Sequence, residues 1–151
     1  MRLRIFWIGK TKDPAVTLWT AEYLKRISRF AQIAAEEIPA RGGEPELLQR
    51  LGRTRPGAQS ANSRLVLLDP AGRRLDSAQF AAYLEQSFAQ DGRELALAIG
   101  GPDGFSANTR AAAQASLSLS PMTYSHELAR AMLLEQVYRA LALLNHHPYP
   151  R

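Results

Sequence analysis

The sequence predicts an α/β fold with a mainly parallel sheet and helices on both of its faces. Residues 3–8, 64–69 and 95–99 are nearly continuous apolar runs, which are typical of strands buried on both faces of a parallel sheet. Helical patterns separate these runs, and alternation of strands with helices favours parallel pairing through crossover helices. Because 151 residues suffice for one core but not two, we expect a single domain over residues 1–151.

The first two predicted elements are a strand and a helix. Residues 3–8 are rich in β-formers and stop at Gly9, as a strand would. Asp13 then offers an N-cap, and Pro14 suits the first turn of the helix that follows. The apolar residues of this helix recur at helical spacing: Val16, Trp19, Tyr23, Ile27 and Phe30.

A second strand and helix come next. Residues 33–38 predict a strand that Pro39 stops, and a helix is expected over residues 45–51. Residues 54–63 are rich in Gly, Pro, Ser and Asn, which indicates a loop.

The middle of the chain contributes another strand and helix. Residues 64–69 form the strand, and the Pro-Ala-Gly sequence at 70–72 is expected to turn the chain. Asp76 can cap a helix that ends near residues 91–92. The apolar residues of this helix are Phe80, Tyr83, Leu84 and Phe88.

Four further elements complete the prediction. Residues 95–99 form a buried strand, and Ser106 caps a short helix that reaches about residue 115. A short strand is expected over residues 117–120. The longest helix is expected over residues 126–144.

The composition excludes several kinds of site. The chain contains no cysteine, which excludes disulfides, thiolate metal sites and cysteine nucleophiles. No pair among His126, His146 and His147 has the spacing of a helical metal site, so we expect no metal. Apolar runs fall short of the roughly 20 residues that span a bilayer, and residues 3–8 lack a signal-peptide cleavage site. We therefore expect a cytoplasmic protein with no membrane partner.

The net positive charge indicates what kind of partner the protein could bind. The formal net charge is +5 and the sequence pI is about 10.0, with Lys and Arg spread along the chain. A basic surface favours a polyanion such as nucleic acid through counterion release. Ordinary solubility is the alternative explanation.

Three loops follow apolar strands and carry the chemistry-bearing signals. They cover residues 68–70, 100–104 and 119–124. Open α/β sheets bind ligands at such strand ends, so the three loops could form one pocket of backbone groups, Met and Leu. The Gly-Gly-Pro-Asp-Gly loop matches neither a dinucleotide fingerprint nor a P-loop, which disfavours a nucleotide-binding module, and taken alone it is a simple turn.

An ordered set of motifs over essentially the whole chain resembles one family. The motifs are LLDPAG (67–72), IGGPDG (99–104), LSPMT (119–123), HELAR (126–130), EQVYRA (135–140) and NHHPY (145–149). Together they resemble the bacterial RlmH family, the SPOUT-class ribosomal RNA large-subunit methyltransferases H. The resemblance implies a C-terminal trefoil knot, an exception to the rule against knotted chains. It also implies a homodimer that methylates N3 of a pseudouridine in 23S ribosomal RNA (rRNA), on the assembled ribosome.

The same resemblance implies S-adenosylmethionine (SAM) as the cofactor. A sulfonium is already an activated methyl donor, so the protein needs only to align it with the nucleophile. The residues implied as SAM contacts are Leu68, Gly100, Leu119, Ser120, Pro121, Met122, Thr123 and Tyr124.

N3 of a uracil-like ring needs assistance to act as a nucleophile, because N3–H is only weakly acidic. A base could remove the proton, or a cation could stabilise the anion. The candidates are Arg139, His147 and Tyr149. Each has an alternative role. Arg139 could be a solvated helix arginine, and His147 could cap the helix C-terminus. Tyr149 could pack at a dimer interface.

One departure from the family pattern concerns the last residues. The family often ends His-Pro-Tyr-His, whereas Pro150 stands at the last of these positions here. Two other functions compatible with the same fold are a non-catalytic ribosome-binding or RNA-binding protein, and a SPOUT methyltransferase that acts on another RNA such as tRNA.

Overall fold

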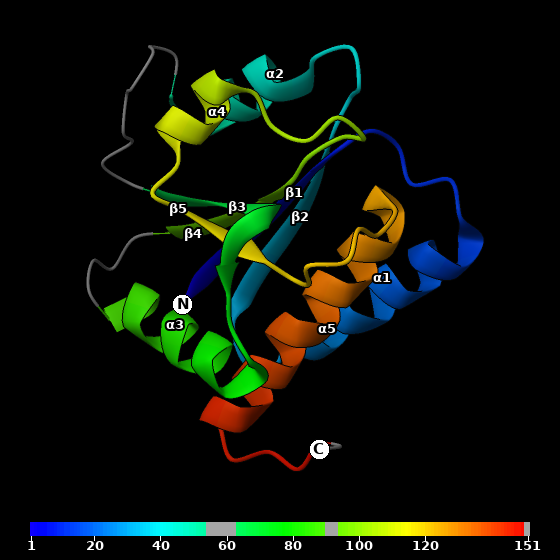
Figure 1. Ribbon diagram of the computed structural model, residues 1–151. Helices are drawn as coiled ribbons and strands as arrows, with labels where there is room; N and C mark the ends of the chain where they lie inside the picture. Colours follow the sequence, from blue (N-terminus) through cyan, green and yellow to red (C-terminus); the bar gives the residue numbers. More distant parts are fainter. Residues whose placement is uncertain (54–62, 90–93, 150–151) are drawn as a thin grey trace.

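The protein is built around a five-stranded sheet in which every pairing is parallel. The computed structural model describes residues 1–53, 63–89 and 94–149 (Figure 1). The strand order is β2-β1-β4-β3-β5. The strands are β1 (Arg2–Ile8), β2 (Gln32–Ile38), β3 (Ser63–Arg74), β4 (Glu94–Ile99) and β5 (Ala115–Ser118).

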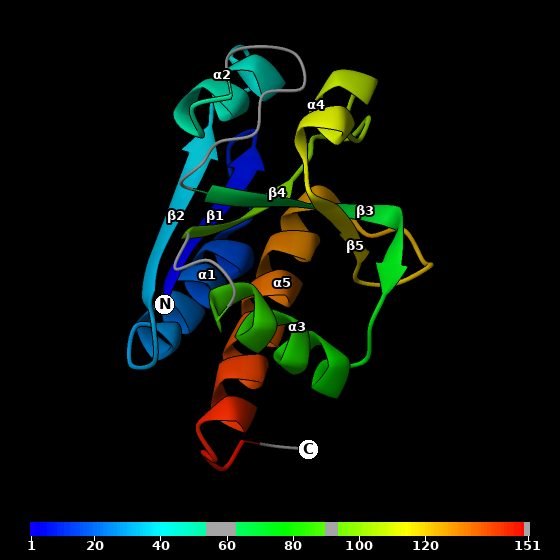
Figure 2. The ribbon, with the colours of Figure 1, turned by 90° about the vertical axis from the view of Figure 1, so that its left-hand side faces the viewer.

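Helices cover both faces of this sheet, as the sequence predicts (Figures 1 and 2). Three of them lie on one face: α1 (Pro14–Ile27), α3 (Ser77–Ala89) and α5 (His126–Leu144). The other face carries α2 (Gly43–Arg50) and α4 (Ala107–Ala112). The α/β class with a parallel sheet is confirmed, while the trefoil knot and the single domain stay predictions. None of the helices in the described ranges is long and apolar enough to cross a membrane.

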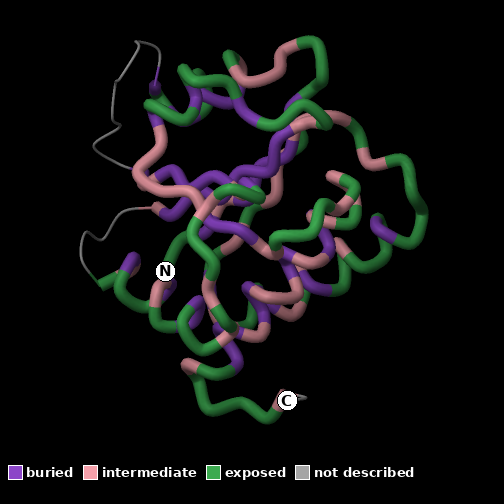
Figure 3. Tube along the Cα trace, viewed as in Figure 1, coloured by how far each residue is buried: buried purple, intermediate pink, exposed green. Residues whose placement is uncertain are grey.

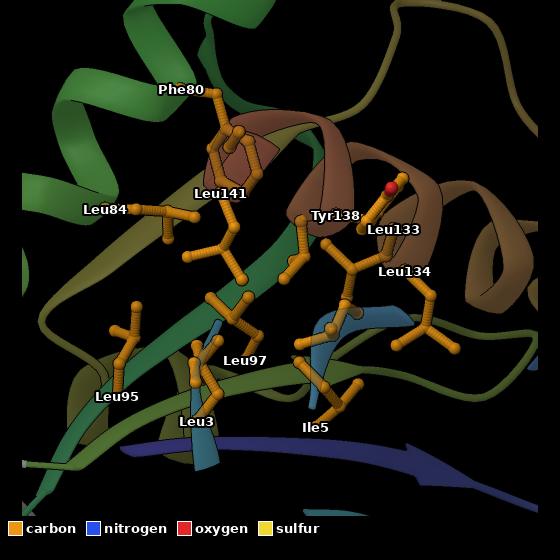
Figure 4. Packing of buried hydrophobic residues seen from close by; sticks show 14 of the residues in the cluster. Leu3, Ile5, Phe80, Leu84, Leu95, Leu97, Leu133, Leu134, Tyr138 and Leu141 are labelled. Atoms are coloured by element: carbon orange, nitrogen blue, oxygen red, sulfur yellow. The ribbon is translucent and has the colours of Figure 1, made fainter. Parts of the chain in front are cut away.

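The larger core lies between the sheet and α1, α3 and α5. Leu3 and Leu97 point from the sheet towards Leu133 and Leu141 of α5 (Figure 4). Buried positions follow the strands and the inner sides of these helices (Figure 3). A smaller core fills the other face, where Phe6, Leu47 and Phe105 meet. Because both faces are covered, the central strands are apolar on both sides.

The helix starts agree with their predicted caps. The Asp13 carboxylate accepts a hydrogen bond from the Ala15 N–H at 2.8 Å. Asp76 and Gln79 form a reciprocal capping box, with bonds of 2.7 Å and 3.0 Å between each side chain and the other residue's N–H. The prediction that α1 extends to Phe30 is wrong, because the helix ends at Ile27 and Phe30 packs against the core from the following turn.

The predicted turn at residues 70–72 is also wrong. Strand β3 continues to Arg74 and pairs with β5 across a shift of register between Leu68 and Arg73. A Cβ on Gly72 would lie 2.7 Å from backbone carbons of Ser116 and Leu117, so glycine permits the close approach of the two strands.

The last strand starts earlier than predicted. Helix α4 ends at Ala112, short of residue 115, and β5 ends at Ser118 and not at residue 120. Gln114 explains the shift, since its N–H donates to the Leu65 carbonyl at 2.9 Å and its side chain accepts from the Leu65 N–H at 2.7 Å. The predicted loop over residues 54–63 and the helix end near 91–92 lie largely outside the described residues, although Ser63 opens β3.

We predict that Gly72→Ala lowers the free energy of unfolding by roughly 1–3 kcal/mol, because backbone atoms cannot move aside for the added methyl group. The measurement is denaturant unfolding followed by circular dichroism. Gly101→Ala is the matched control, because a Cβ there meets no atom within 4 Å. Equal stability of the two variants would contradict the proposed close contact.

Candidate functional site

Residues 68–70, 100–104 and 119–124 contribute to one open pocket of about 300 Å³ at the carboxyl edge of the sheet. The first segment lies within β3, beside its shift of register, and not in a loop after the strand as predicted, whereas the other two follow β4 and β5. The start of α5 closes one side with His126 and Ala129. Of the residues implied as SAM contacts, those that line the pocket are Leu68, Gly100, Leu119, Ser120, Met122, Thr123 and Tyr124. Pro121 is exposed and does not line it.

The glycine loop after β4 folds back on itself. Gly101 and Gly104 form an isolated bridge, and the Gly104 N–H donates to the Gly101 carbonyl at 3.0 Å. Gly104 has φ +73°, which favours glycine. A Cβ on Gly100 would lie 3.3 Å from both the Gly104 carbonyl carbon and the Phe105 ring. The loop is therefore tightly packed beneath Gly100 and open above Gly101.

A carboxylate from α2 anchors the end of this loop. Glu44 accepts hydrogen bonds from the N–H of Ser106 at 3.0 Å, from its hydroxyl at 2.5 Å, and from the Thr109 hydroxyl. Ser106 in turn caps α4, as predicted, by accepting from the Thr109 N–H at 3.3 Å. Local sequence patterns do not reveal the role of Glu44, because it lies 62 residues before Ser106.

The loop after β5 is shaped by its own serines. The Ser118 hydroxyl donates to the Ser120 carbonyl at 2.8 Å, and the Ser120 hydroxyl accepts from the Met122 N–H at 3.0 Å. The Met122 side chain is 72% exposed at the pocket rim. This loop therefore offers apolar surface, backbone groups and hydroxyls, a combination typical of small-molecule sites.

One ion pair borders the pocket. The Asp69 carboxylate contacts the Arg110 guanidinium and also accepts from the Ala71 N–H at 2.9 Å. Arg110 donates to the Phe105 carbonyl at 3.1 Å. The pair therefore ties strand β3 to α4 and, through the Phe105 carbonyl, to the loop after β4. No group of three or more His, Asp or Glu residues in the described ranges is arranged to hold a metal ion.

A buried arginine supports the neighbouring loop at residues 9–13. Arg130 is 0% exposed and donates to the carbonyls of Ile8 at 3.1 Å and Gly9 at 3.0 Å, and to the Thr11 hydroxyl at 2.6 Å. Its guanidinium carbon lies 5.5 Å from the centre of the Trp7 ring. Burial lowers the pKa of Arg130, and the carboxylates of Glu127 and Glu37 oppose that shift.

The predicted catalytic residues lie elsewhere. Arg139 is ten residues beyond Ala129, or about 15 Å along the helix axis at 1.5 Å per residue. His147 and Tyr149 follow the end of α5, opposite to its pocket end (Figure 1). One chain therefore does not bring these three residues to the pocket.

These residues belong to an aromatic cluster. Arg139 is paired with Glu135 at 2.6 Å, and its guanidinium carbon lies 4.8 Å from the centre of the Tyr149 ring. The Tyr149 hydroxyl is 3.2 Å from that of Tyr23, and the His147 ring meets Phe30 edge-on. Burial and then the Tyr23 hydrogen bond raise the pKa of Tyr149, whereas the bond to Glu135 raises that of Arg139. At neutral pH, Tyr149 is therefore uncharged and Arg139 is cationic.

The His147 side chain does not cap the helix. Its backbone N–H does so, by donating to the Ala142 carbonyl at 2.9 Å, and His146 adopts the left-handed conformation with φ 53°. The alternative of a solvated Arg139 is likewise wrong, given its contacts with Glu135 and Tyr149.

Comparisons with known proteins agree on one family. A family model described as predicted SPOUT methyltransferase matches residues 1–150. The chain is 41% identical to the ribosomal RNA large subunit methyltransferase H of Trichlorobacter lovleyi, with 99% of both chains covered. It is 42% identical to the protein of that name from Koribacter versatilis, over 99% of this chain and 97% of the relative. It is 41% identical to that of Solibacter usitatus, with 100% of both covered.

We predict that Arg130→Met destabilises the fold by about 2–3 kcal/mol, because it leaves two partly buried carbonyls and a hydroxyl without their donor. Thermal or denaturant unfolding measures the loss. Arg2→Met, on an exposed side chain, is the control and should change stability by less than about 0.5 kcal/mol. A stable Arg130→Met protein would show that the loop is held without the arginine.

Proposed function

The chain belongs to the SPOUT methyltransferase family, and from this premise we propose that it transfers a methyl group from SAM to N3 of a pseudouridine in 23S rRNA. Relatives that match it over their full length are named ribosomal RNA large subunit methyltransferase H, which supports rRNA as the substrate. We place the reaction on the assembled ribosome, in the cytoplasm. The single observation that carries the proposal is the pocket lined by seven of the eight predicted cofactor contacts.

The residues of the pocket fit this cofactor. Leu68, Leu119 and Met122 offer apolar surface for a flat adenine ring. The space above Gly101 accommodates a ligand, because a side chain there would meet no atom within 4 Å. The sulfonium supplies an activated methyl group when bound, so the protein has only to orient it and exclude water. The glycine loop, anchored through Ser106 by Glu44, provides a rigid wall for that purpose.

The groups that assist the nucleophile must come from a second copy of the chain. Arg139 remains cationic and suits stabilisation of a pyrimidine anion, but it lies about 15 Å along α5 from the pocket. We therefore propose a homodimer in which the C-terminal end of one subunit completes the pocket of the other. His147 is the candidate base, whereas Tyr149 stays neutral and orients Arg139 through its ring.

An exposed apolar face between α1 and α5 supports the dimer. Trp19 is 55% exposed and Leu128 is 46% exposed, and both line a groove with Val16 and Met132. Large exposed apolar side chains gathered on one face are typical of a subunit interface.

The first experiment measures transfer of labelled methyl from SAM to three substrates: ribosomes lacking the modification, the same ribosomes lacking the pseudouridine, and free 23S rRNA. We expect transfer to the first alone. Activity on tRNA would indicate a different RNA target, and RNA binding without SAM binding would indicate a non-catalytic protein.

Gly100→Val should weaken SAM binding about tenfold or more, because it overpacks the turn at Gly104 and Phe105. Calorimetry showing unchanged SAM affinity in that variant would place the pocket elsewhere.

Mixed dimers test the shared site. Gly100→Val impairs the pocket and Arg139→Ala impairs the C-terminal end, so each homodimer should have little activity at SAM concentrations well below the Kd of the Gly100→Val variant. After the two chains are mixed and exchanged at equal amounts, half of the dimers are mixed and each has one intact composite site, which predicts about a quarter of wild-type activity. An inactive mixture that has exchanged subunits would mean that each site lies within one chain.

A further inference from the structure

The loop between β1 and α1, residues 9–13, lies beside the pocket. Strands β1 and β4 are parallel neighbours, with Trp7 paired to Ile99. Since Ile99 and Gly100 line the pocket, the chain leaving β1 emerges at the same edge of the sheet, one strand away (Figure 1).

Three side chains from elsewhere in the fold hold this exposed loop. Glu127 accepts from the backbone N–H groups of Lys12 at 2.6 Å and Asp13 at 3.0 Å. Glu37 accepts from the Thr11 N–H at 3.2 Å, and Arg130 holds the other side of the loop as described above. A surface loop with this many long-range bonds is fixed before any partner binds, which lowers the entropic cost of binding.

The fixed loop presents two lysines to solvent. The side chains of Lys10 and Lys12 are exposed, and within the described ranges neither has an ion-pair partner. The Glu127 carboxylate of α5 accepts from the backbone N–H groups of this loop and forms no ion pair with either lysine. Two unpaired cations on a rigid loop suit a polyanion.

The pocket and the loop share one support. Glu127 and Arg130 lie in the first turns of α5, interleaved with His126 and Ala129, which line the pocket. A displacement of this helix start would therefore move the pocket wall and the lysines together.

We propose that Lys10 and Lys12 bind phosphate groups of the rRNA strand that enters the pocket, with Glu127 and Arg130 as positioning residues that hold the loop in register with the pocket. The inference rests on the proposed function for the identity of the RNA. It adds the surface that grips the strand next to the target nucleotide.

The test compares Lys10→Ala/Lys12→Ala with a control that removes two exposed charges at the opposite edge of the sheet, Arg2→Ala/Arg29→Ala. Ribosome binding and methyl transfer are measured for each. We expect the lysine variant to raise KM for ribosomes several-fold while kcat and SAM affinity stay at wild-type values. The magnitude of the slope of log affinity against log salt should fall by about 1.4, since each lost phosphate contact to a single strand removes about 0.7. The control should retain the wild-type slope.

The positioning role has its own readout. Glu127→Ala should raise the KM for ribosomes, and Glu127→Gln should restore most of the affinity, because its side-chain carbonyl still accepts from the loop. In the Lys10→Ala/Lys12→Ala background, Glu127→Ala should cause no further rise in KM. An additive effect there would show that Glu127 does not act through the lysines.

Failure of this inference differs from failure of the proposed function. An active enzyme whose lysine variant keeps its KM and salt slope overturns the phosphate grip and leaves the methyltransferase intact. A wild-type protein that transfers no methyl group refutes the proposed function. The binding measurement still decides the role of the lysines, because a wild-type salt slope in their variant counts against it.

Discussion

Burial of α5 against one face of the parallel sheet is the constraint on which the rest of the structure depends. Its inward residues Leu133, Leu134, Val137 and Leu141 are fully buried, and each contributes about 1.5–3 kcal/mol relative to exposure. The same helix begins at the pocket and ends at the aromatic cluster. Its packing therefore fixes the positions of the pocket wall, of the loop at residues 9–13 and of the C-terminal residues.

The same helix also sets a fixed distance. A helix cannot shorten, so Ala129 at the pocket and Arg139 in the aromatic cluster stay about 15 Å apart along its axis within one subunit. Arg139 and Tyr149 are held by Glu135 and Tyr23, contacts that keep the C-terminal segment ordered at the far end.

Much of the fold follows from local sequence signals. Apolar runs identified the parallel strands, and Asp13, Asp76 and Ser106 marked helix starts, because capping depends on residues only two or three positions apart. The close approach of β3 to β5 was missed, since the Pro-Ala-Gly sequence at residues 70–72 is equally typical of a turn. The roles of Glu44 and Arg130 also escaped prediction, because their partners lie 62 and 119 or more residues away in sequence. The resemblance identified most of the residues that line the pocket. The segments that carry them were singled out because they follow apolar runs.

The bond from Arg130 to Gly9 has a consequence for how the chain is made. Its two ends are separated by 121 residues, and β1 cannot pair with β4 until more than half of the chain has been synthesised. Strand β1 therefore waits for α5 before the loop that follows it is fixed. Such non-local closure slows folding, so β1, which can pair early with β2, gains its contacts with β4 and α5 only after those later elements have been made.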